Sequence, residues 1–163
     1  MGLFRFKIRI TETQFIRDLV EDVIHDSKET QDVITLKHKL NQVAPTSFYR
    51  MEAIIFNAFL TSYSLTLAGV SNQTKDRFLK ACTNDIERHY GLGLHMERRI
   101  LIYHSGLEQP GLGPLPGIVI DSALQAITAC DSDNNPELRR VLLSFVRSQQ
   151  NDLVPYFKKL TIL

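Results

Sequence analysis

Residues 53–68 form the most apolar stretch of the chain, and they constrain the fold more than any other segment. Two rows of large side chains recur in it at helical spacing: Phe56, Leu60, Tyr63 and Leu67, and beside them Ile55 and Phe59. A helix that is apolar or small around nearly its whole circumference must be surrounded by other helices. The stretch is too short and carries too many Ser, Thr and Asn residues for a membrane span, which needs about 20 apolar residues. We therefore predict a buried central helix over residues 47–68.

Further helices are predicted on both sides of this segment. Hydrophobic periodicity and capping residues place helices over 12–27 and 30–43, and a third that starts after the polar run 71–74 and is broken at Gly91. A short helix through Met96, Ile100 and Tyr103 is closed by Gly106, one with Ile120 in its apolar seam runs to about Cys130, and another starts at Pro136 and is capped by Asn135. In the tail, Val154 and Phe157 allow a last helical turn. The predicted fold is mainly α: a single helical domain over 1–163, with about six to eight helices around the central one.

A short N-terminal β-strand completes the predicted architecture. Residues 4–11 alternate strictly, with Phe4, Phe6, Ile8 and Ile10 on one side and basic residues between them. The strand needs a hydrogen-bonding partner, because unpaired backbone groups beside a core are costly. That partner is either the β-tolerant tail over 159–163 or the same strand of a second subunit, so the four apolar side chains are candidates for self-association.

Composition limits the remaining classes of function. The chain has 163 residues, 44% of them hydrophobic, which suits one globular domain. Its formal net charge of +1 supplies no field that would attract nucleic acid or anionic lipid. Cys82 and Cys130 lack the spacing of a zinc site or a disulfide scaffold, and the N-terminus lacks the apolar run of a secretory signal. We expect a cytoplasmic protein that neither spans nor is anchored to a membrane.

No catalytic, metal or cofactor motif is present. His104 with Glu97 and Glu108 has metal-ligand spacing, but Gly106 is expected to end the helix before Glu108. His89 and His95 flank a Gly-Leu-Gly turn and are no stronger as ligands. We predict no catalytic residue, no metal site and no cofactor, although catalytic groups can converge in space in ways that one sequence does not display.

The candidate ligand site lies beside the longest predicted loop. Residues 106–117 contain four of the eight glycines and three of the six prolines. Long loops on a rigid scaffold often carry binding residues. If the chain binds a small anionic ligand, we expect Arg98, Arg99, Tyr103 and His104 to contact it, since they directly precede this loop.

Three functional hypotheses follow from the sequence. The first is a non-catalytic cytosolic interaction or regulatory protein, a homodimer that self-associates through its N-terminal strand. The second is a helical small-ligand-binding sensor or small enzyme with its pocket beside the 106–117 loop. The third is a nucleic-acid-binding protein, which would require Arg5, Arg9, Arg98, Arg139 and their basic neighbours to cluster on folding.

Overall fold

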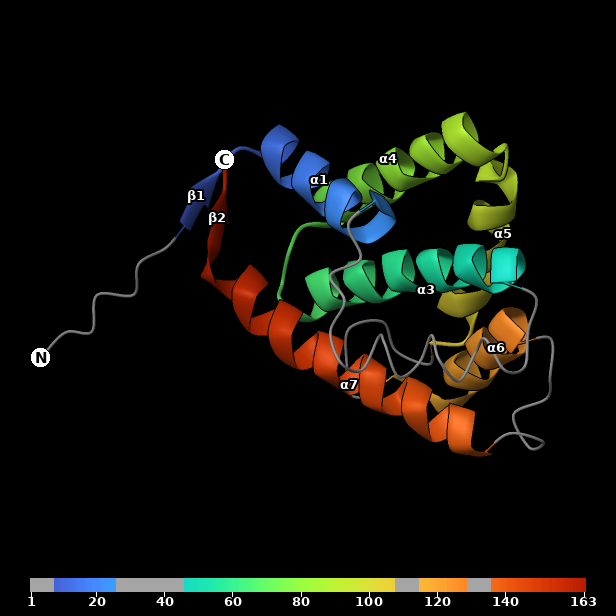
Figure 1. Ribbon diagram of the computed structural model, residues 1–163. Coiled ribbons are helices and arrows are strands. Elements are labelled where there is room, and N and C mark those ends of the chain that lie inside the picture. Colours follow the sequence, from blue (N-terminus) through green and yellow to red (C-terminus); the bar gives the residue numbers. More distant parts are fainter. Residues whose placement is uncertain (1–7, 26–45, 108–114, 129–135) are drawn as a thin grey trace, which may run out of the picture.

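The computed structural model describes residues 8–25, 46–107, 115–128 and 136–163, which form a helical bundle with a small sheet at one end (Figure 1). In chain order the elements are β1 (Ile8–Ile10), α1 (Glu12–Val20), the π-helical segment η1 (Glu21–His25), α3 (Thr46–Leu67), α4 (Asn72–Tyr90), α5 (Gly93–Ser105), α6 (Gly117–Thr128), α7 (Pro136–Lys159) and β2 (Leu160–Ile162). The predicted mainly α fold is confirmed. The predicted helix over 30–43 and the predicted cap Asn135 lie outside the described residues.

Helix α3 is the centre of the bundle. It packs against η1 and against each of α4, α5, α6 and α7. The side chains of Ile55, Phe59 and Leu60 have no exposed surface. The buried Ser64 hydroxyl donates to the Leu60 carbonyl over 2.8 Å, so the helix itself satisfies this polar group. The predicted buried central helix is confirmed, with Thr46 and Leu67 as its limits.

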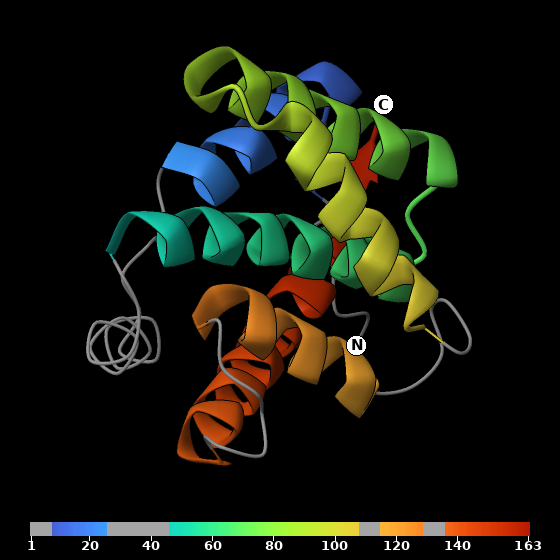
Figure 2. The ribbon, with the colours of Figure 1, turned by 90° about the vertical axis from the view of Figure 1, so that its right-hand side faces the viewer.

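The other helices cover α3 in two layers. Helices α1 and α4 pack together on one side of it, and α6 and α7 pack together on the other (Figure 1). Helix α5 crosses α3, which it contacts between Glu52 and Phe59, and packs against α4 as well (Figure 2). None of the helices described here combines the length and apolar character that crossing a bilayer requires.

The two ends of the described chain meet in a parallel sheet. Strand β1 pairs with β2 in the register Ile8 with Leu160 and Ile10 with Ile162. Ile10, Leu160 and Ile162 pack against the core, whereas Arg9 on the opposite face is exposed, as the alternation predicts. The sequence left two hydrogen-bonding partners open for this strand. In the structure, residues 8–10 pair with the tail of the same chain.

Helix ends occur at the capping residues that the sequence contains. At the start of α4, the Ser71 hydroxyl accepts a hydrogen bond from the Thr74 backbone N–H over 3.1 Å. Gly69 after α3 and Gly91 after α4 have φ values of 80° and 66°. Residues with a side chain rarely adopt this left-handed conformation, which explains why both helices stop there.

Helix α7 is longer than the sequence patterns indicate. It runs through Pro155 without a break to Lys159. Proline lacks the N–H that would bond to the carbonyl of Asn151, but Asn151 is exposed and water can bond that carbonyl. The turn after Pro155 is held by packing, since the buried Phe157 ring meets the Phe15 ring edge to face at 5.9 Å.

Candidate functional site

Helix α5 has two chemically different faces, and both bear on function. The helix begins at Gly93, whose backbone N–H donates to the Glu87 carboxylate over 2.7 Å, and ends at Ser105, with Gly106 as its C-cap. Its inner face carries His95, Arg99 and Tyr103, spaced by four residues and directed at α3. Residues spaced by four lie on the same face of a helix, which is why these three side chains meet one partner helix.

The inner face surrounds a buried carboxylate on α3. Glu52 has no exposed surface, His95 Nε2 lies 2.5 Å from its Oε1, and Arg99 Nε lies 3.3 Å from its Oε2. A carboxylate removed from water is tolerated only when cations or hydrogen-bond donors replace its hydration. Here α5 supplies both, so this cluster adds to the packing of Met96 and Ile100 in fixing the rotation of α5 about its own axis.

Tyr103 closes the buried end of this cluster. Its ring packs against Phe56 and Phe59, with centroids 5.4 and 5.2 Å away. Burial raises the pKa of Tyr103, and the negative charge of Glu52 adds to this effect. The phenol therefore stays protonated at neutral pH and is not a base. Among the described residues, neither the Tyr103 hydroxyl nor Glu52 Oε2 has a hydrogen-bond partner.

The four residues of the predicted ligand site do not share one face of α5. Arg99 and Tyr103 lie together on the inner face, whereas Arg98 and His104 are exposed. One edge of the His104 ring contacts Phe59 at a centroid distance of 5.4 Å, and partial burial lowers the pKa of this histidine. Tyr103 and His104 thus share Phe59 as a neighbour and Arg99 pairs with Glu52, whereas Arg98 is exposed. The loop residues 108–114 lie outside the described part of the chain.

Sequence reasoning missed two members of the inner cluster, Glu52 and His95. A signal for each was present. Glu52 is the only charged residue between Met51 and Ala68, so a charge on a helix predicted to be buried on all sides required a cationic partner. His95 precedes Arg99 by four residues and therefore shares its face of the helix.

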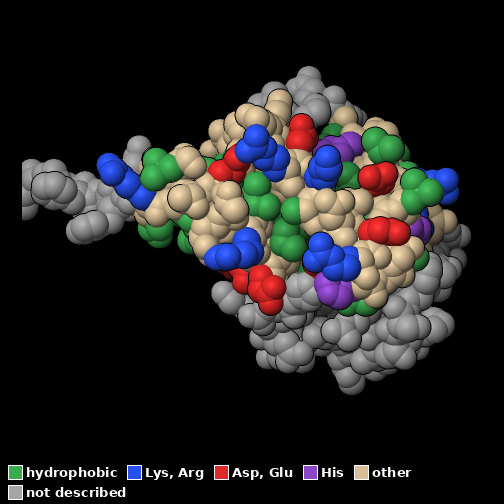
Figure 3. All heavy atoms as spheres, turned by 90° about the horizontal axis from the view of Figure 1, so that it is seen from above, with side chains coloured by type: hydrophobic (Ala, Val, Ile, Leu, Met, Phe, Trp, Pro, Cys, Tyr) green, Lys and Arg blue, Asp and Glu red, His purple; other side chains and the backbone are tan. Residues whose placement is uncertain are grey.

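The outer face of α5 exposes large apolar side chains. Leu94 and Leu101 are 61% and 67% exposed, and Ile102 is also exposed. Ile118 at the start of α6 is 63% exposed and lies beside the end of α5, where its Cγ2 is 3.4 Å from the Cβ position that Gly106 lacks. We call these four residues the α5–α6 apolar surface. Glu97 and Arg98 lie between its leucines in the chain. Seen from above, charged, histidine and apolar side chains mix over the described surface (Figure 3).

The predicted self-association strand is partly described. Phe4 and Phe6 lie outside the described residues, Ile8 is 49% exposed, and Ile10 packs against the core. In the described sheet of two strands, one edge of β1 has no strand beside it. That edge and Ile8 are what β1 could offer to a second subunit.

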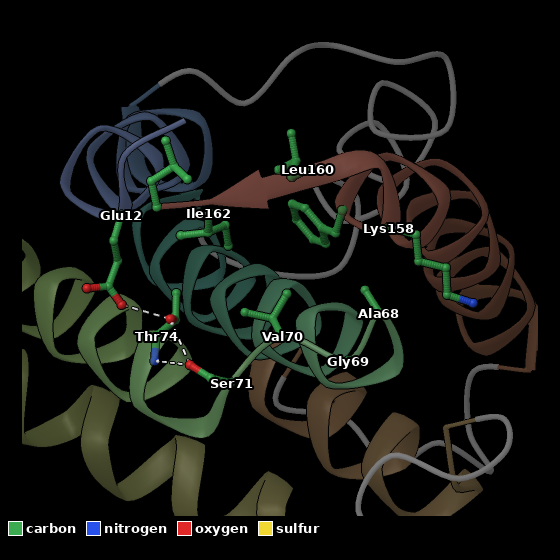
Figure 4. Close-up of a pocket in the computed structure, with 11 residues that line it drawn as sticks. Glu12, Ala68, Gly69, Val70, Ser71, Thr74, Lys158, Leu160 and Ile162 are labelled. Atoms are coloured by element: carbon green, nitrogen blue, oxygen red, sulfur yellow. Dashed lines mark hydrogen bonds between the residues drawn. The ribbon is translucent and has the colours of Figure 1, made fainter. Parts of the chain in front are cut away.

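A groove of about 440 Å³ lies next to β2, between the turn that joins α3 to α4 and the end of α7 (Figure 4). Its apolar lining includes Val70, Phe157, Leu160 and Ile162, and Val70 and Ile162 face the space between them. On its rim, Glu12 accepts a hydrogen bond from the Thr74 hydroxyl over 2.7 Å. This groove is distinct from the pocket predicted beside residues 106–117.

Comparison with known proteins gives no family for this chain: no family model, curated protein or solved structure matches it. Its function must therefore be argued from its own residues.

Proposed function

We propose that the protein is a non-catalytic interaction protein that acts as a homodimer and associates through the α5–α6 apolar surface. The observation that carries this proposal is the exposure of Leu94, Leu101, Ile102 and Ile118 on adjoining elements. Single exposed apolar residues are ordinary, but a group of large ones with charged neighbours is typical of a protein interface.

A second copy of the chain is the partner that best fits this surface. The outer face of α5 carries an acid, Glu97, and a base, Arg98, beside its leucines. In a dimer of identical chains, the acid of each copy can therefore pair with the base of the other. The formal net charge of +1 also means that two copies repel each other only weakly.

The N-terminal strand remains a competing contact within the same proposal. Its main-chain partner in the structure is β2 of the same chain, so association through β1 would use only its outer edge and Ile8. A three-residue edge offers few hydrogen bonds. We therefore place the principal contact on α5.

Light scattering on the full chain over a concentration series tests the proposal. We expect a concentration-dependent dimer, loss of the dimer in Leu101→Glu, and a normal dimer in the matched control Ile8→Glu, which places the same charge on an exposed residue of β1. Circular dichroism checks that both variants fold. A monomer at all concentrations overturns self-association, and loss of the dimer only in Ile8→Glu moves the contact to the strand.

The second candidate function is binding of a small apolar ligand, and the groove beside β2 favours it. Its lining of Val70, Phe157 and Ile162 suits a hydrocarbon or aromatic group. Native mass spectrometry of the purified protein tests this candidate. A co-purifying small molecule that is lost in a Val70→Glu variant supports it, and a clean apo mass argues against it.

The proposed site of action is the cytosol, and the free buried thiol of Cys82 is compatible with a reducing compartment.

Nucleic-acid binding gains no support from the arginines of the third hypothesis. Arg98 and Arg99 point to different faces of α5, and Arg139 is paired with Asp121 at 2.7 Å.

A further inference from the structure

The outer face of α5 has a simple geometry about its midpoint, between Glu97 and Arg98. Leu94 and Leu101 are seven residues apart, which is close to two helical turns, so both point along nearly the same outward direction. Glu97 and Arg98 lie about 50° to either side of that direction. The face therefore has a ridge of two leucines, with an acidic flank on one side and a basic flank on the other.

These flanks distinguish the two ways in which α5 can pack against its own copy about a two-fold axis. When the axis runs along the helices, the helices are parallel and each acidic flank faces the partner's basic flank. When the axis is perpendicular to the plane that contains both helices, they are antiparallel and like flanks face each other. Charges interact favourably in the first case and unfavourably in the second.

We propose that two copies of the chain pair through α5 in the parallel orientation. Leu94 and Leu101 each pack on the same residue of the partner, and Glu97 of each copy faces Arg98 of the other. This inference rests on the proposed self-association and adds to it the orientation and the pairing residues. The partner is a second copy of this chain.

Other contacts of α5 support this arrangement. The helix cannot easily turn its outer face away, because Glu52 holds His95 and Arg99 on the inner face. Neither Glu97 nor Arg98 has an ion-pair partner within the described part of the chain, so both are available across an interface.

Charge reversal tests the pairing. Glu97→Arg and Arg98→Glu each convert two attractive pairs into two repulsive ones, and we expect each to weaken dimerisation by about tenfold at low salt and by less at high salt. The double variant, with both substitutions, restores the attraction and is expected to dimerise like the wild type. If the single variants dimerise as well as the wild type while the wild type is a dimer, the pairing is wrong.

Cysteine crosslinking tests the orientation directly. In a Cys130→Ser background, which leaves only the buried Cys82, Leu94→Cys is expected to form a disulfide-linked dimer with itself under mild oxidation. Antiparallel packing would instead link Leu94→Cys only with Leu101→Cys in a mixture of the two variants, and that result overturns the parallel orientation. If the wild type is a dimer but no combination links, the contact lies elsewhere. If the wild type is a monomer, the proposed self-association itself is wrong, whatever the orientation.

Discussion

His95 Nε2 on α5 and Glu52 Oε1 on α3 are 2.5 Å apart, although 43 residues separate them in the chain. Because Glu52 is wholly buried and His95 is not, the contact joins the interior of the bundle to its surface. The same carboxylate pairs with Arg99 one turn further along α5. This buried carboxylate, together with the buried Met96, Ile100 and Tyr103, determines which face of α5 turns inward and which apolar residues remain outside.

The cluster predicts an unequal response to removal of its members. The double variant His95→Leu, Arg99→Met leaves Glu52 buried without a cation. Because an unpaired buried charge is unfavourable, we expect the free energy of unfolding to fall by about 3–5 kcal/mol. Glu52→Gln should cost less, about 1–3 kcal/mol, because the side chains of His95 and Arg99 are 35% and 27% exposed and can reach water. Urea denaturation measures both values.

A triple variant provides the control. Replacing all three polar groups, with Glu52→Leu added to the double variant, removes the stranded charge and should recover much of the lost stability. If the triple variant is no more stable than the double, the cost comes from packing rather than from the uncompensated carboxylate.

Tyr103 leads to a prediction of the opposite sign. Its ring is buried among Phe56 and Phe59, but its hydroxyl has no hydrogen-bond partner among the described residues. We expect Tyr103→Phe to leave stability unchanged or to raise it by up to about 1 kcal/mol, since a buried unpaired hydroxyl is unfavourable. Tyr103→Ala, by contrast, should cost about 3–5 kcal/mol through the cavity that it leaves. A large loss in thermal stability for Tyr103→Phe would mean that the hydroxyl has a partner.

The central helix was predictable because its apolar residues occupy nearly every direction. A helix without a polar face is stable only when other helices surround it, so α3 was expected at the centre of the bundle. Leu60 is fully buried, as expected. The chain ends were less determined. Alternation predicted a strand at Ile8–Ile10, but nothing local to that strand decides between Leu160–Ile162 and a second subunit as its partner.

The candidate site could be predicted only in part, because the side chains of consecutive residues on a helix point in different directions. Arg98 and Arg99 are adjacent, yet consecutive residues point about 100° apart, and only Arg99 turns inward with Tyr103. Helix α5 also has apolar residues on most of its sides, including Leu94, Ile100 and Leu101. The residues that are buried, Met96, Ile100 and Tyr103, are those that recur at helical spacing. The pairing of His95 and Arg99 depends instead on Glu52 of another helix, which the periodicity of α5 does not show.

Leu60 tests the architecture itself. It lies on α3 with no exposed surface, where α3 is covered by helices of both layers. We expect Leu60→Ala to lower the free energy of unfolding by about 2–5 kcal/mol, since the removed atoms leave a cavity that a close-packed core fills incompletely. Leu101→Ala is the matched control, because Leu101 is 67% exposed in the monomer. Equal thermal shifts for the two variants at a concentration where the protein is monomeric would contradict the central position of α3.

Glu12 links α1 to α4 and makes stability depend on pH. The hydrogen bond from the Thr74 hydroxyl, together with Arg77, holds the pKa of Glu12 below its ordinary value of 4.5. A carboxyl with a lowered pKa in the folded state contributes its full stabilisation above the unfolded value and loses it as the pH falls through the folded value. Glu12→Gln should therefore be less stable than the wild type at neutral pH, and the difference should disappear at acidic pH.

In Thr74→Val the pKa of Glu12, followed by NMR, should rise, whereas Thr13→Val on the exposed side of α1 should leave this pKa unchanged. A stability difference between Glu12→Gln and the wild type that persists unchanged into acid would show that this carboxylate does not act through its charge.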